Sequence, residues 1–206
     1  MEIFIIIAVI VVLIPLLAFL WHYLSINVLN PSGKGADAKT RKILRKYALL
    51  RNYKVLDNLT FEIKGKPVHV QNVLIGFFGL LFVETRGARG EYYGEVESPR
   101  WIFTQENRRQ PIENPLHTGQ LAIQAVRPAL AAKKIFNIPM ERVAVISNSS
   151  KKTAFYVTQT DLVFTLKKFK SYVHRSKFEE DKEVDVEKVA AVIQEYSDAC
   201  KAKFPQ

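Results

Sequence analysis

The chain has 206 residues, of which 48% are hydrophobic and 24% are charged, and this composition fits one globular domain with an additional apolar segment. A formal net charge of +10 favours negatively charged partners, either anionic lipid or nucleic acid, without choosing between them. The lone cysteine, Cys200, excludes a disulfide framework and suits a reducing compartment.

The N-terminal run from Ile3 to Leu20 contains no charged residue, and the aromatic segment Trp21–Tyr23 follows it directly. Such a run can cross a hydrocarbon core of about 30 Å, with aromatic side chains at the interface. A cleaved signal peptide is the alternative, but the only charge before the run is Glu2, and no Ala-x-Ala cleavage pattern follows it. We therefore expect a transmembrane helix and its interface over residues 1–29.

Positive charge follows this run and does not precede it. By the positive-inside rule, the N-terminus is expected outside and the C-terminal domain in the cytoplasm. The same cations are close enough to the bilayer to contact anionic lipid headgroups, and contact with nucleic-acid phosphates is the alternative. The residues expected at the membrane surface are Lys34, Lys39, Arg41, Lys42, Arg45 and Lys46.

Turn-forming residues over 30–36 predict a linker, and residues 37–206 are expected to form one domain. Apolar periodicity predicts helices over 37–51, 118–136 (broken or bent at Pro128), 161–169 and 185–203, the last capped by Asp185. It predicts strands over 53–63, 68–75, 80–85, 91–96, 101–104, 142–147 and 155–158, with a polar loop over 105–113. This order of elements predicts an α/β fold with a mixed sheet flanked by helices.

The hairpin formed by the strands over 68–75 and 80–85 carries the most informative polar residues. Its second strand ends in Glu84, Thr85 and Arg86, and side-chain alternation places Glu84 and Arg86 on the same face. A structural ion pair would explain the two residues. A functional site is the other interpretation, because a polar residue at the end of an apolar strand needs a reason.

A series of short motifs surrounds this hairpin between Gly35 and Ser147. They are an acid at a helix start (Asp37), Tyr53–Leu56, Gly79, Val83–Arg86, the Gly90–Gly94 loop, Trp101 and Asn114–Leu116. In this order and spacing, the chain resembles the nuclease-related (NERD) domain. That family is a branch of the PD-(D/E)xK restriction-endonuclease-like superfamily and is often fused to a membrane anchor.

The resemblance implies metal-dependent hydrolysis of nucleic-acid phosphodiesters. In the family pattern, an acid on the first helix, an Asp at the end of one strand and a Glu-x-Lys on the next hold Mg²⁺ and position a water. The corresponding catalytic positions here are Asp37, Gln71, Glu84 and Arg86. Asp37 and Glu84 are the expected metal ligands.

Three residues depart from the family sequence on these two strands. Gln71 and Asn72 stand where Asp and His are usual, and Arg86 replaces the lysine. An amide oxygen carries no charge to attract Mg²⁺, so the affinity is expected to be weak, and arginine cannot take part in proton transfer. The site is therefore expected to suit phosphate binding better than hydrolysis. The alternative for Gln71 and Asn72 is a structural role, in which they only hydrogen-bond neighbouring loops.

Four side chains are expected to contact DNA or RNA if the resemblance extends to substrate binding: Arg86, Arg89, Gln120 and Gln124. The two glutamines lie one turn apart on a predicted helix, where a plain surface role is the alternative. No second His or Cys stands at zinc-ligand spacing. Two other functions remain open: a membrane-tethered module that binds lipid or an unknown protein, and an active Mg²⁺-dependent endonuclease with a variant site.

Overall fold

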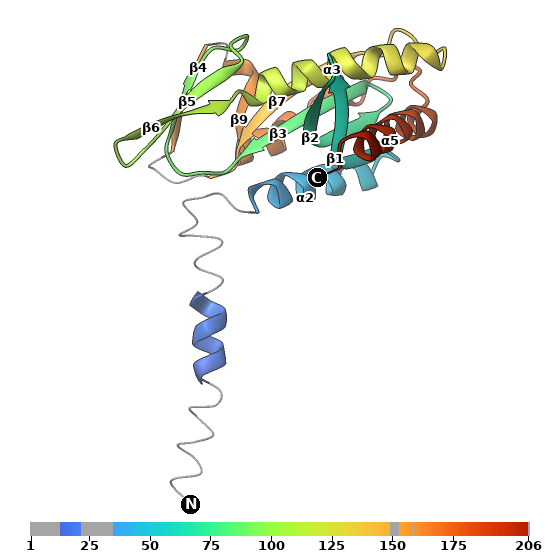
Figure 1. Ribbon diagram of the computed structural model, residues 1–206. Helices are drawn as coiled ribbons and strands as arrows, with labels where there is room; N and C mark the ends of the chain where they lie inside the picture. Colours follow the sequence, from blue (N-terminus) through green and yellow to red (C-terminus); the bar gives the residue numbers. More distant parts are fainter. Residues whose placement is uncertain (1–12, 22–34, 149–152, 159, 206) are drawn as a thin grey trace, which may run out of the picture.

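The computed structural model describes residues 13–21, 35–148, 153–158 and 160–205 (Figure 1). The helices are α2 (Ala36–Leu49), α3 (Pro115–Ala132), α4 (Leu166–Tyr172) and α5 (Val186–Lys203). The strands are β1 (Lys54–Ile63), β2 (Lys66–Gly76), β3 (Gly79–Arg86), β4 (Glu91–Gly94), β5 (Arg100–Gln105), β6 (Arg108–Glu113), β7 (Met140–Ile146), β8 (Ala154–Val157) and β9 (Val163–Thr165). Two short 3₁₀ helices, Thr160–Leu162 and Ser176–Phe178, complete the order.

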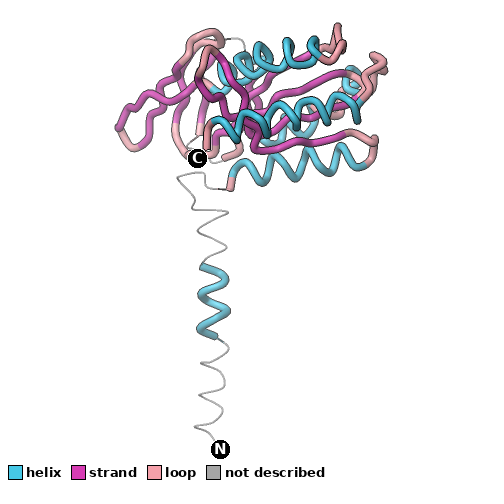
Figure 2. The backbone as a smooth tube through the Cα atoms, turned by 45° about the vertical axis from the view of Figure 1, so that its right-hand side comes forward, coloured by secondary structure: helices cyan, strands magenta, loops and turns pink. Residues whose placement is uncertain are grey.

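The strands form two mixed sheets flanked by helices. The larger sheet has the order β1-β2-β3-β7-β9, antiparallel from β1 to β3 and parallel from β3 to β9. The smaller sheet has the order β6-β5-β4-β8, and its β5–β6 hairpin projects from the body of the domain (Figures 1 and 2). The prediction of an α/β fold is thus confirmed at the level of class, while the prediction of a single sheet was wrong.

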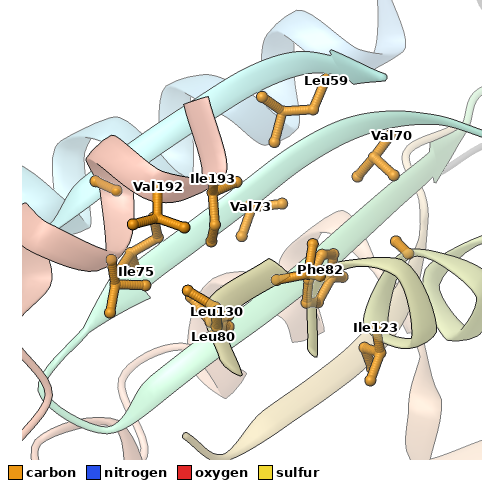
Figure 3. Packing of buried hydrophobic residues seen from close by; sticks show 14 of the residues in the cluster. Leu59, Val70, Val73, Ile75, Leu80, Phe82, Ile123, Leu130, Val192 and Ile193 are labelled. Atoms are coloured by element: carbon orange, nitrogen blue, oxygen red, sulfur yellow. The ribbon is translucent and has the colours of Figure 1, made fainter. Parts of the chain in front are cut away.

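Hydrophobic side chains cover both faces of the larger sheet. On one face, Leu80 and Phe82 of β3 pack with residues of α3 and α5, such as Leu130 and Ile193 (Figure 3). On the other face, residues of β3 such as Val83 pack with α2 and α4. Successive residues of a strand point to opposite faces, so neighbouring residues of β3 contact different helices. The larger sheet thus lies between a layer with α3 and α5 and a layer with α2 and α4.

Three local predictions were wrong. The expected polar loop over 105–113 contains β6, which pairs antiparallel with β5. The helix expected over 118–136, broken or bent at Pro128, runs from Pro115 to Ala132 without a break, and it begins at Pro115 because Asn114 caps it. Residues 161–169 form a 3₁₀ turn, β9 and the start of α4 where a single helix was expected.

The expected membrane segment lies largely outside the described residues, as does most of the linker over 30–36. Residues 13–21 are helical and their side chains are exposed. Within the described ranges, no helix is long and apolar enough to span a bilayer. The buried side chains of these ranges all lie between Thr40 and Cys200, so a fragment of residues 35–206 contains the entire described core.

Candidate functional site

At Gln71, the backbone hydrogen bonding between β2 and β3 gives way to hydrogen bonds made by a side chain. The regular ladder ends where Asn72 faces Val83. At the next position the Gln71 side chain replaces the strand backbone: its Oε1 accepts from the Thr85 N–H at 2.6 Å, and its Nε2 donates to the Thr85 carbonyl at 3.3 Å. Both ends of the carboxamide are therefore used to hold the end of β3.

Glu84 is buried at this strand end. Glu84 is 3% exposed, and its Oε1 accepts a hydrogen bond from the Gln71 N–H at 2.8 Å. The other oxygen lies 3.8 Å from Nη1 of Arg86. Burial raises the pKa of Glu84 to about 7, against the smaller opposing effects of the Gln71 hydrogen bond and the Arg86 charge. Near neutral pH the carboxyl group is thus divided between its charged and neutral forms.

A pocket of about 740 Å³ adjoins Glu84 on the face that carries α3 and α5. Its lining carries groups of both charges, which are Arg86 and Lys201 on one hand and Glu84 and Glu113 on the other. Several residues that line this pocket were not predicted from the sequence, because they come from segments that are far apart along the chain. Those residues are Asn58, His69, Glu113, Thr118, Lys201 and Phe204.

Asp37 lies on the other face of the sheet. It belongs to the first turn of α2, and its carboxylate is engaged by the Arg41 guanidinium and by Nδ2 of Asn72. It lines a second pocket of about 350 Å³, which shares Gln71 and Arg86 with the first. The structure therefore brings Gln71, Glu84 and Arg86 together in the first pocket, and places Asp37 with Gln71 and Arg86 in the second.

The donor set does not fit a Mg²⁺ ion. Mg²⁺ requires hard oxygen ligands in near-octahedral geometry, usually with one or two carboxylates. Here the Asp37 carboxylate and the Gln71 carboxamide are both committed to protein donors, and the Arg86 guanidinium stands beside Glu84. Among the described residues, no three or more His, Cys, Asp or Glu side chains are arranged to hold a metal ion.

Arg86 is held in a fixed orientation at the wall between the two pockets. Its Nη1 donates to the Thr85 carbonyl at 3.2 Å and its Nη2 donates to the Glu113 carbonyl at 3.3 Å. The side chain keeps 23% exposure, and its remaining N–H groups are available to an anion. The guanidinium thus presents a permanent, oriented positive charge.

The other residues predicted to contact nucleic acid, Arg89, Gln120 and Gln124, do not line the pockets around Glu84 and Asp37. Arg89 is half-buried in the segment between β3 and β4. On α3, Gln120 is half-buried and Gln124 is exposed, but Thr118 is the residue of this helix that lines the Glu84 pocket. The part of α3 that lines the Glu84 pocket is therefore Thr118, which precedes Gln120 by two residues and Gln124 by six.

The remaining motifs of the resemblance are structural. Asn114 is fully buried, and its Nδ2 donates to the carbonyls of Glu95, Val96 and Ser98 at 3.2, 2.8 and 2.6 Å. Its Oδ1 accepts from the Leu116 N–H at the start of α3. Gly94 leaves room for Trp101, since a Cβ atom there would lie 2.1 Å from the indole ring. These residues join the smaller sheet to α3.

Comparison with known proteins agrees with the resemblance. Residues 32–147 match the nuclease-related domain (NERD) family. An uncharacterized protein of Bacillus anthracis is 27% identical over 95 residues, which are 46% of this chain and 44% of that protein. The chain thus matches less than half of that curated relative, and no solved structure matches it significantly. Because the family match covers more than half of the sequence, the chain belongs to the nuclease-related domain family.

Proposed function

We propose that this protein is a membrane-anchored, cytoplasmic NERD domain that binds nucleic acid through its phosphates and has weak or no metal-dependent nuclease activity. The core of α2, β1 to β3, α3 and β7 is then a restriction-endonuclease-like fold that keeps the shape of an ancestral site. Family membership supports the nucleic-acid partner, and the net charge of +10 supports binding of a polyanion.

The proposal rests on the hydrogen bonds made by the side-chain oxygens of Gln71 and Asp37. Gln71 and Asp37, which would coordinate a metal ion, are bonded to protein donors instead. Arg86 occupies the position of the family lysine and has a fixed guanidinium. Such a group binds a phosphate bidentately, but its pKa is too high for it to exchange a proton with a nucleophile.

The membrane attachment rests on the uncharged run from Ile3 to Leu20 and on the cations that follow it. The charge distribution supports an outer N-terminus and a cytoplasmic domain. Extraction of the full chain from membranes by alkaline carbonate would contradict the anchor. Its retention until detergent is added would support it.

Replacing the guanidinium, in the variant Arg86→Gln, is expected to weaken binding of an oligonucleotide about tenfold at low salt. Loss of one phosphate contact should also reduce the slope of log K against log salt by about 1. Fluorescence anisotropy of labelled single- and double-stranded DNA and RNA with residues 35–206 measures both quantities, and also distinguishes the type of nucleic acid.

Arg127→Gln is the matched control, because Arg127 is an exposed arginine of α3 that does not line the pockets around Glu84 and Asp37. It removes the same charge and should change the affinity less than threefold. If the two substitutions weakened binding equally, the binding would depend on the net positive charge of the domain. That result would contradict a specific role for Arg86. Absence of salt-dependent binding would contradict the nucleic-acid partner.

A further inference from the structure

The outward side of α2 is a stripe of exposed residues with one sign of charge. Its buried side consists of Thr40, Leu44, Tyr47 and Ala48. The exposed residues recur at helical spacing and are Ala38, Lys39, Lys42, Arg45, Lys46 and Leu49. In Figures 1 and 2, α2 lies at the outside of the domain, with its length along the lower surface. This outward side is called the α2 stripe below.

The acids near the α2 stripe are already neutralised by arginines. Asp37 is paired with Arg41, and Asp57 is paired with both Arg41 and Arg45 at 2.8 and 3.1 Å. Arg45 nevertheless keeps 61% exposure of its side chain. The three lysines of the stripe make no ion pair with any described residue, so their charges are available to an external anionic surface.

At the C-terminal end of α2, where the stripe ends, two large apolar side chains are exposed. Leu49 is 82% exposed and Leu50 is 71% exposed. Tyr53, which follows them in the chain, packs edge-on against Phe77, itself 40% exposed. Adjacent exposed leucines at the end of a cationic helix are typical of a surface that enters the headgroup region of a bilayer.

We propose that the α2 stripe docks on an anionic lipid surface, with Lys39, Lys42 and Lys46 at the headgroups and Leu49 and Leu50 in the acyl boundary. The inference rests on the proposed membrane attachment, which would hold α2 close to the bilayer. A nucleic acid would satisfy the lysines but would leave the leucines in water. A lipid surface satisfies both, because it offers negative charge above an apolar layer.

The test uses the full chain in nanodiscs of phosphatidylcholine alone or with one quarter phosphatidylserine. A nitroxide is attached through Leu49→Cys in a Cys200→Ser background, and its collision rates with oxygen and with a water-soluble nickel chelate are measured. The discs with phosphatidylserine should raise the oxygen rate and lower the nickel rate at least threefold. A nitroxide attached through Phe136→Cys, at another exposed apolar site, should show no lipid dependence.

The triple variant Lys39→Glu, Lys42→Glu and Lys46→Glu should abolish the effect of phosphatidylserine, since each cation near an anionic leaflet changes partitioning about fivefold. Equal accessibility of position 49 in both lipids, with the chain retained in the disc, would overturn the docking alone. A fall in both collision rates, whether or not phosphatidylserine is present, would assign the stripe to a contact with a second copy of the chain and would equally overturn the docking. Loss of the chain from the disc in alkaline carbonate would overturn the attachment, and with it the docking.

Discussion

Glu84→Gln is expected to stabilise the domain by about 3 kcal/mol at pH 8 and to have little effect near pH 4.5. Burial raises the folded-state pKa of Glu84 from 4.5 to about 7, so the folded state binds a proton more tightly than the unfolded state does. Stability from this group is therefore full at low pH, falls as the pH rises between about 4.5 and 7, and stays low above 7. Glutamine removes the titration and keeps an oxygen for the Gln71 N–H.

Denaturant unfolding of residues 35–206 at pH 4.5 and pH 8 measures the effect. Glu95→Gln is the control, because Glu95 is exposed and its loss should change stability by less than about 0.5 kcal/mol at either pH. A difference between Glu84→Gln and wild type that is the same at both pH values would contradict the raised pKa. The folded domain would then hold Glu84 in a single charge state across this range.

Asn114→Asp is expected to destabilise the domain by about 3 to 5 kcal/mol. The substitution is nearly isosteric and keeps the oxygen that caps α3, but it removes the N–H groups that one buried and two part-buried carbonyls share. It also places a carboxylate at a fully buried position, opposite carbonyl oxygens. Both the unsatisfied acceptors and the unpaired charge are costly in a buried environment.

Thermal and denaturant unfolding of residues 35–206 again gives the measurement. Asn107→Asp makes the same chemical change at an exposed turn between β5 and β6, where a positive φ tolerates either residue. It should cost less than about 0.5 kcal/mol. A loss below 1 kcal/mol for Asn114→Asp would show that the smaller sheet is not fixed to α3 by this side chain.

Much of the fold could be predicted from local sequence patterns. The rest depends on the pairing of strands that are far apart along the chain, which no local pattern shows. The hairpin of β2 and β3 and the helix capped by Asp185 were found because apolar periodicity and capping residues occur within a few positions. The strand β6 was missed because its residues, with sequence RRQPIE, are mostly polar and exposed, as edge strands often are. The second sheet was missed because β4 pairs with β8, about sixty residues away.

The candidate site was likewise predicted in part, where the prediction depended on one strand, and missed where it depended on packing. Alternation along β3 correctly put Glu84 and Arg86 on one side, and the two lie 3.8 Å apart. The sequence could not show that Asp37 faces the opposite side of the sheet, since that depends on how α2 packs. The alternative that Gln71 and Asn72 hydrogen-bond their neighbours agrees with the structure, in which each contributes its amide to a protein partner. Their use as ligands would require those bonds to break.

The central claim, that this NERD domain binds phosphate without efficient hydrolysis, is tested most directly by a cleavage assay at pH 8, where Glu84 is largely ionised. Residues 35–206 and the variant Glu84→Ala are incubated with supercoiled plasmid and either Mg²⁺ or Mn²⁺. We expect wild type and Glu84→Ala to give the same background level of nicking. Robust cleavage by the wild type that Glu84→Ala abolishes would contradict it.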